Sequence, residues 1–97
     1  MKTFENTELG VKFDLPEDIT LRQELNYFST VDPSVPWMLA AWQAAMTLVK
    51  NWECETIPDP HKLDLDKKHK RIITQIIVWV GTEVSAYVNG LGVPSPK

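Results

Sequence analysis

Residues 71–92 read RIITQIIVWVGTEVSAYVNGLG, and the structure of this stretch decides which fold the chain can have. Its uncharged run, Ile72 to Thr82, has eleven residues, whereas a helix needs about 20 apolar residues to span a bilayer. A membrane anchor is therefore excluded. The many β-branched side chains favour a strand by propensity, so a buried strand and a core helix remain to be distinguished.

The spacing of the apolar residues favours the helix. On a helix they share one sector roughly 160° wide, and polar residues occupy the opposite side. We predict a helix over residues 66–89 that is capped by Asp64 or Asp66 and stopped by Gly90. This helix is the expected core element, and its predicted core residues are Ile76, Ile77, Val80, Val84 and Tyr87.

A second apolar segment, VPWMLAAWQAAMTLVKNWE at residues 35–53, is also predicted to be a helix. Ser34 can cap its start, and Pro36 is tolerated in its first turn. The mostly apolar part, from Trp37 to Val49, has thirteen residues, which suits a buried helix and is too short for a membrane span.

This predicted helix carries two apolar stripes. A helix that is apolar on two faces has more surface than so small a domain can cover, so we expect self-association or another partner. The predicted core residues are Met38, Trp42 and Val49, and the predicted partner-binding residues are Trp37, Ala40, Ala44, Leu48 and Trp52.

The N-terminal part of the chain predicts a ribbon and a short helix. Alternation of apolar and polar residues indicates a β-ribbon over residues 3–15. Thr20, with Gln23 three residues later, is a capping-box signal for a helix over residues 21–29. The predicted fold is therefore mostly α: one three-helix small domain over residues 1–97, with the short N-terminal β-ribbon and a flexible tail at 90–97.

Composition favours a small interaction module over an enzyme. A chain of 97 residues with net charge -3 forms one domain and has no overall attraction for nucleic acid or acidic membranes. Cys54 is the single cysteine, so no internal disulfide can form, and the N-terminus lacks the apolar run of a signal peptide. We expect a cytoplasmic protein.

The polar residues give little support for a catalytic, metal or nucleic-acid site. Residues 61–71 carry a local charge of +3, but no aromatic residues interleave with the bases, so a solvated face explains the run better than nucleic-acid binding. The spacing of Cys54, His61 and His69 matches no recurrent zinc pattern. No phosphate loop or activated nucleophile is present, so we expect neither a cofactor nor an enzyme.

Three segments resemble the short tail assembly chaperones of long-tailed bacteriophages. They are LPEDITLRQELNYFS at residues 15–29, WQAAMTLVKNWECETIPD at 42–59 and IIVWVGTEVSAYVNGLGVPSPK at 76–97. The family often shows a T-x-RQ helix start, an aromatic-rich helix ending in W-x-C-E-x-x-P-D, and a closing element with II-x-W-x-G and Y-x-N-x-L. The resemblance covers roughly residues 15–97.

This resemblance implies a mostly helical protein that forms homo-oligomers in the cytoplasm of a bacterial host. It also implies that the protein coats the long tape measure protein and recruits tail tube subunits during assembly. Two other classes remain open: a virion structural accessory protein of the head or tail, and a small nucleic-acid-binding regulator that uses the basic run.

The resemblance further implies a second, longer product. Tail assembly chaperones are often also made as a fusion, through a programmed backward slip of the ribosome near the end of the short form. Ser95-Pro96-Lys97 can be encoded by the slip-prone heptamer C-CCA-AAA. We expect that heptamer in the gene, followed by an overlapping reading frame of about a domain length.

Overall fold

The computed structural model describes residues 1–31, 34–64 and 66–91, and its fold is α+β. The prediction of a mostly α, three-helix domain is wrong, because the described residues include a three-stranded antiparallel sheet. In chain order the elements are β1 (Lys2–Asn6), β2 (Val11–Leu15), α1 (Leu21–Thr30), α2 (Trp37–Ala45), β3 (Lys50–Cys54), the short 3-10 helix η1 (Pro60–Lys62) and α3 (Arg71–Leu91).

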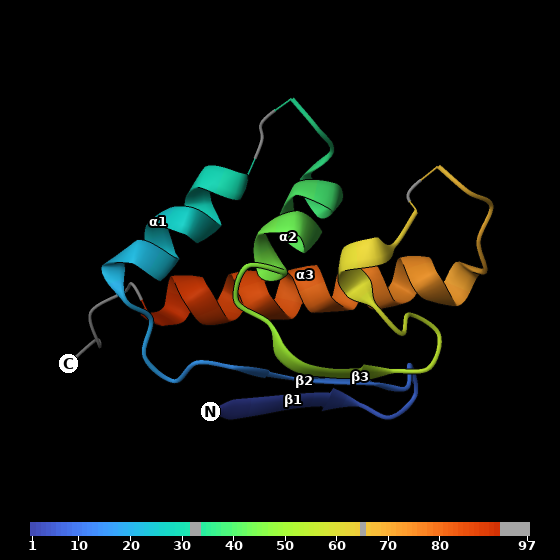
Figure 1. The fold of residues 1–97 in the computed structure, drawn as a ribbon, viewed down its shortest axis with the longest axis horizontal. Coiled ribbons are helices and arrows are strands. Elements are labelled where there is room, and N and C mark those ends of the chain that lie inside the picture. Colours follow the sequence, from blue (N-terminus) through green and yellow to red (C-terminus); the bar gives the residue numbers. More distant parts are fainter. Residues whose placement is uncertain (32–33, 65, 92–97) are drawn as a thin grey trace.

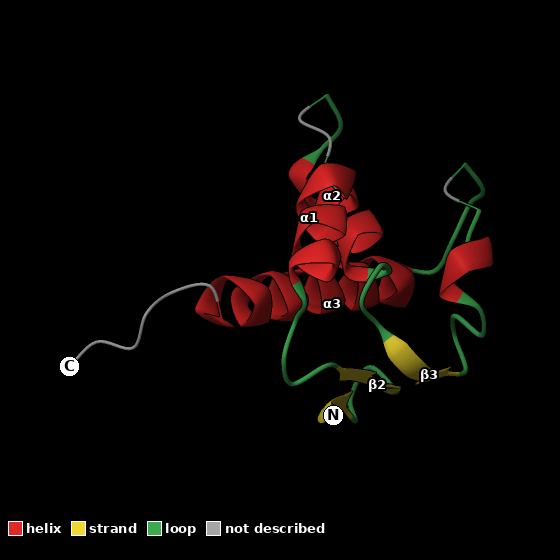
Figure 2. Ribbon diagram, turned by 60° about the vertical axis from the view of Figure 1, so that its left-hand side comes forward, coloured by secondary structure: helices red, strands yellow, loops and turns green. Residues whose placement is uncertain are grey.

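The elements form three layers with α3 in the middle. The sheet covers one side of α3, and α1 and α2 stand on the other side as a protruding helical hairpin (Figure 1). Figure 2 shows the hairpin nearly edge-on, with α1 and α2 overlapping in the view above α3. Because α3 is covered on two sides, it is the core element that its apolar spacing predicted.

The sheet is built on the predicted ribbon. β1 pairs with β2 so that Phe4 lies opposite Phe13, and β3 pairs with the other edge of β2. Gly10 ends the turn between the first two strands with a φ of 68°, a conformation that glycine adopts at no steric cost. Alternate residues of β2 point inward, and Val11, Phe13 and Leu15 are all buried.

The helix predicted over residues 35–53 is wrong in its second half. It ends at Ala45, where the Thr47 hydroxyl turns back and donates a hydrogen bond to the Ala44 carbonyl at 2.7 Å. Residues 50–54 then form β3, because a two-stranded ribbon is marginal alone and β2 has a second edge that needs hydrogen-bond partners. A bulge at Asn51, with φ of 53°, adjusts the register of β3 to β2.

The helix predicted over residues 66–89 exists, but both of its predicted ends are wrong. α3 begins at Arg71, and the Asp64 carboxylate accepts a hydrogen bond from the Asp66 backbone in a separate turn. Gly90 does not stop the helix, which continues to Leu91. The rest of the predicted tail, with Ser95-Pro96-Lys97, lies outside the described residues.

The core lies where α3 meets α2 and the sheet. Ile76, Val80 and Val84 of α3 are completely buried. α3 crosses α2 closely at Gly81, where a Cβ atom would lie 3.2 Å from the Ala41 Cβ. A glycine here therefore permits a short distance between the two helices.

The other predicted core residues are distributed between the core and its edge. Trp42 is buried, whereas Val49, Ile77 and Tyr87 are partly buried and pack against the core. The Tyr87 hydroxyl donates a hydrogen bond to the Pro16 carbonyl at 2.8 Å and so ties α3 to the segment after β2. Among the described residues, no helix combines the length and the apolar character that crossing a bilayer requires.

Candidate protein-binding surface

The predicted partner-binding stripe of the second helix is not an exposed face. Ala40, Ala44 and Leu48 are at most 2% exposed, because α2 turns its alanine face toward α3 and the chain after Ala45 bends into the core. Of the five residues predicted to bind a partner, Trp37 is the exposed one, with 58% of its surface accessible.

Trp52 also has a structural role. Its indole nitrogen donates a hydrogen bond to the Ile57 carbonyl at 2.6 Å, and its ring packs against Phe13 and Trp42. Met38 shows the opposite error, because it was predicted in the core and is 49% exposed. The Trp52 prediction assumed one continuous helix over residues 35–53, and Trp52 lies instead on β3. Met38 lies within α2, in its exposed first turn.

An exposed apolar face lies instead on α1. Leu21, Leu25 and Phe28 are 71%, 56% and 46% exposed, and their spacing of i, i+4 and i+7 places them on one side of the helix. We name these three residues the α1 face. The helical spacing was visible in the sequence, but it did not show whether the face is covered within the chain.

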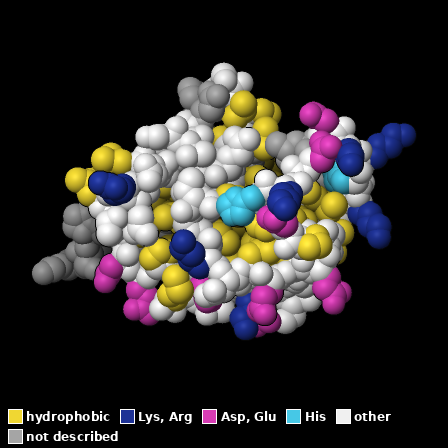
Figure 3. Space-filling model, in the orientation of Figure 1, with side chains coloured by type: hydrophobic (Ala, Val, Ile, Leu, Met, Phe, Trp, Pro, Cys, Tyr) yellow, Lys and Arg dark blue, Asp and Glu magenta, His cyan; other side chains and the backbone are white. Residues whose placement is uncertain are grey.

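Further exposed apolar residues lie at the C-terminal end of α1 and at the start of α2. Figure 3 shows two groups of hydrophobic side chains in this region, one over the N-terminal end of α1 at the left and one beside the α1–α2 connection at the top. Of seven large hydrophobic residues exposed in the described part of the chain, six belong here and the seventh is Met1. We call these six the hairpin surface: Leu21, Leu25, Phe28, Val31, Trp37 and Met38.

A capping box and one buried side chain fix the position of α1, and its outer side remains exposed. The Thr20 hydroxyl accepts a hydrogen bond from the Gln23 backbone, and the Gln23 side chain accepts one from the Thr20 backbone, which confirms the predicted capping box. Tyr27 is the buried residue of α1. Burial raises the pKa of its hydroxyl, although a hydrogen bond with Ser85 of α3 acts in the opposite direction.

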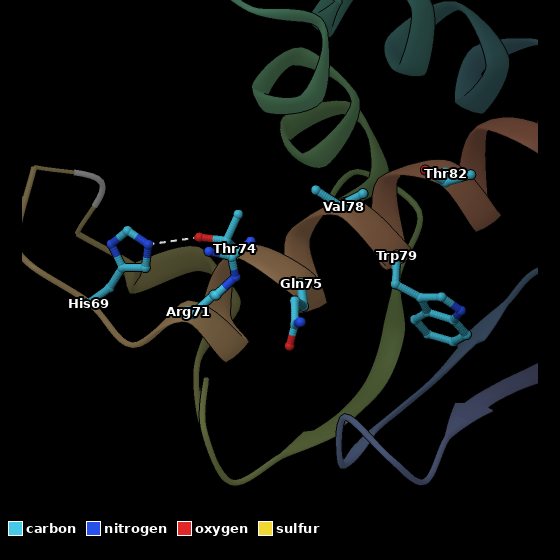
Figure 4. Close-up of a pocket in the computed structure, with 7 residues that line it drawn as sticks. All are labelled: His69, Arg71, Thr74, Gln75, Val78, Trp79 and Thr82. Carbon is cyan, nitrogen blue, oxygen red and sulfur yellow. Dashed lines mark hydrogen bonds between the residues drawn. The ribbon is translucent and has the colours of Figure 1, made fainter.

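A second candidate surface is a hollow along one flank of α3, which we name the α3 groove. It has a volume of about 760 Å³. Figure 4 shows Val78 on the side of α2, and Gln75 and Trp79 directed toward the sheet. At one end, His69 Nε2 lies 2.7 Å from the Thr74 hydroxyl. The groove is lined by His69, Arg71, Thr74, Gln75, Val78, Trp79 and Thr82.

The α3 groove adjoins a second hollow on the side of α2. A smaller hollow of about 170 Å³ shares His69, Thr74 and Val78 with it and is also lined by Met38 and Ile77. Met38 thus belongs both to the hairpin surface and to the border of this second hollow. Side chains from α2 and α3 together form a largely apolar region with a polar end.

The basic run lies at that polar end. Lys62 and Lys67 pair with Asp59 and Asp64 at 4.0 Å, whereas no ion pair between described residues includes Lys68, Lys70 or Arg71. Those three bases are exposed beside the start of α3. Arg71 lines the groove and places a positive charge at its end.

The residues considered as metal ligands do not come together in the described part of the chain. Across residues 1–31, 34–64 and 66–91, no three His, Cys, Asp or Glu side chains come together in a way that could hold a metal ion, and Cys54, His61 and His69 are no exception. Comparison of the chain with known proteins gave no match to a family model, a curated protein or a solved structure. The arrangement of exposed apolar side chains is therefore the feature from which function is argued.

Proposed function

We propose that this protein is a tail assembly chaperone of a long-tailed bacteriophage, acting in the cytoplasm of the bacterial host. In this role it forms homo-oligomers, coats the tape measure protein and recruits tail tube subunits. The resemblance of residues 15–97 to that family supplies the class, and the hairpin surface supplies the physical basis for binding.

The observation that carries the proposal is the concentration of exposed apolar side chains on one protruding hairpin. Six large side chains between Leu21 and Met38 are exposed, while the opposite face of the molecule is a sheet with polar residues outward. Monomeric soluble proteins rarely leave such a group uncovered without a binding role. Trp37 is the largest of the six, and tryptophan is among the residues that contribute most to interfaces.

A long, helical client suits this surface. Three side chains at i, i+4 and i+7 form the pattern with which an amphipathic helix meets the apolar side of a partner. Covering the apolar faces of a client delays its aggregation, because aggregation proceeds through the same exposed surfaces. Binding of this kind needs neither a catalytic group nor a cofactor.

Co-expression with the tape measure protein of the same genome tests the proposal. The wild-type chain should keep the client in the soluble fraction, and Trp37→Asp should reduce that fraction several-fold because it places a charge in an apolar contact. Asn26→Asp is the control, since it adds the same charge to the hairpin at an exposed position outside the hairpin surface.

Equal insolubility of the client with and without the wild-type chain would contradict the chaperone role. Purified phage particles provide a second measurement, because an assembly chaperone should be absent from them. Its presence there in fixed stoichiometry would assign the protein to the virion instead.

A further inference from the structure

The α1 face and the α3 groove belong to different parts of the molecule. α1 stands over the C-terminal half of α3, where Tyr27 meets Ser85 (Figure 1). The groove follows residues 71–82, in the N-terminal half of the same helix. α1 therefore cannot enter the groove of its own chain, and no described residue of the same copy covers either surface.

The α3 groove is long enough to take the α1 face and offers apolar contacts to it. Leu21 to Phe28 rise by roughly 10 Å along α1, and residues 71–82 rise by roughly 16 Å along α3, at about 1.5 Å per residue. One flank of α3 thus accommodates two turns of a docked helix. Its apolar contacts are Val78 and the Trp79 ring, which is itself held edge-on against Phe13 at 5.9 Å.

The charges around the two surfaces are complementary. Between residues 18 and 28 two acids, Asp18 and Glu24, outnumber one base, Arg22, whereas residues 61–71 carry a net charge of +3. Glu17 is left out of this count because it pairs with the N-terminal ammonium at 3.4 Å. Glu24 lies beside the α1 face, and Arg71 lines the groove. Pairing α1 with α1 would leave the groove empty, whereas pairing α1 with the groove brings Glu24 toward the basic start of α3 and covers both surfaces.

We infer that the occupant of the α3 groove is α1 of a second copy of this chain. The contact is heterologous, with a different surface from each copy, so repeating it produces a closed ring or an open filament of subunits. It deepens the proposed function by naming the contact through which copies associate, and it rests on that proposal only in treating the α1 face as a binding surface. Where the α1 face is occupied by a neighbouring copy, the client contacts the rest of the hairpin surface: Val31, Trp37 and Met38.

Mixing two variants of the purified chain tests this contact. Leu25→Asp damages the α1 face and leaves the groove intact, whereas Val78→Asp damages the groove and leaves α1 intact. Arg71→Glu at an exposed position is the second groove variant, in case Val78→Asp fails to fold. Asn26→Asp is the control outside both surfaces, and light scattering at about 50–100 µM gives the mass, while circular dichroism checks folding.

The wild type and Asn26→Asp should have masses above the monomer that fall as salt is raised. Each damaged variant should be monomeric, and an equimolar mixture of Leu25→Asp with a groove variant should give a species of twice the monomer mass that grows no further. That outcome requires one intact copy of each surface in the same contact.

Three results would overturn the inference: a monomeric wild type, a mixture that stays monomeric, or groove variants that still associate while Leu25→Asp does not. The last result would indicate α1–α1 pairing. A monomeric wild type would also remove the homo-oligomer from the proposed function, whereas the other two results would overturn this contact alone. Client binding is judged separately by the co-expression result, because no client is present in this experiment.

Discussion

α1 and α3 are both amphipathic helices, yet they use their apolar residues in opposite ways. α3 buries Ile76, Val80 and Val84 completely between the α2 layer and the sheet. α1 buries Tyr27 and leaves Leu25 more than half exposed. The comparison teaches that an i, i+4 apolar pattern identifies a helix face, whereas the neighbouring elements decide whether that face stabilises the fold or binds something else.

The largest expected difference is in the loss of stability when one aliphatic residue is truncated on α3 and one on α1. Ile76→Ala should lower the free energy of unfolding by about 2–5 kcal/mol, because it leaves a cavity in the core. Leu25→Ala should change it by less than about 0.5 kcal/mol, because its site is exposed. Urea unfolding followed by tryptophan fluorescence measures both, and a similar loss for the two variants would break the comparison.

The next largest expected effect is the loss of stability when the α2–α3 crossing is overpacked. Gly81→Leu should cost about 1–3 kcal/mol, because the new Cβ would already lie 3.2 Å from the Ala41 Cβ. Gly90→Leu is the matched control on the same helix, since nothing lies within 4 Å of a Cβ there. Thermal unfolding should show a lower midpoint for the first variant alone; an equal drop at Gly90 would argue against a specific close contact.

Removing the cap of α1 should have a smaller and more local effect. Thr20→Ala deletes the acceptor of the Gln23 backbone hydrogen bond, which costs about 1 kcal/mol at a helix N-terminus. Because α1 is held by few buried side chains, hydrogen exchange should accelerate in α1 and stay unchanged at Val80 in α3. Uniform acceleration across both helices would show that α1 opens only with the whole fold.

The smallest expected effect is a pH dependence in the sheet that covers α3. The Thr3 hydroxyl and the Asn51 amide donate hydrogen bonds to the Asp14 carboxylate at 2.6 and 2.8 Å, and they lower the pKa of Asp14. A lowered folded-state pKa means that this stabilisation is present above the ordinary aspartate pKa of about 3.9 and is lost as the pH falls through the folded value.

Acid unfolding measures this effect against two variants. Asp14→Asn and Thr3→Val should each be less stable than the wild type at neutral pH, and the difference should shrink below about pH 4. A difference that stays constant on acidification would mean that the carboxylate is not the stabilised form. Neither substitution should change the local stability of α1, because neither residue lies on that helix.

Local patterns were sufficient wherever an element is specified by its own residues. The alternation of Val11, Phe13 and Leu15 predicted the ribbon, the Thr20–Gln23 box predicted the start of α1, and the period of the Ile76–Val84 stripe predicted a helix despite its β-branched residues. These features depend on neighbours at most four residues apart, so the sequence alone determines them.

Only the tertiary structure decided the conformation of residues 46–54 and which apolar surfaces stay exposed. Lys50–Cys54 forms a strand because the free edge of β2, far away in the sequence, supplies its hydrogen-bond partners, and Asn51 tolerates the left-handed conformation that the bulge needs. Likewise, Leu48 is buried because it packs into the core cluster, and Leu25 is exposed because nothing among the described residues covers it. Burial depends on which elements pack together in three dimensions. The spacing of apolar residues along one segment does not show which other segment will pack against it.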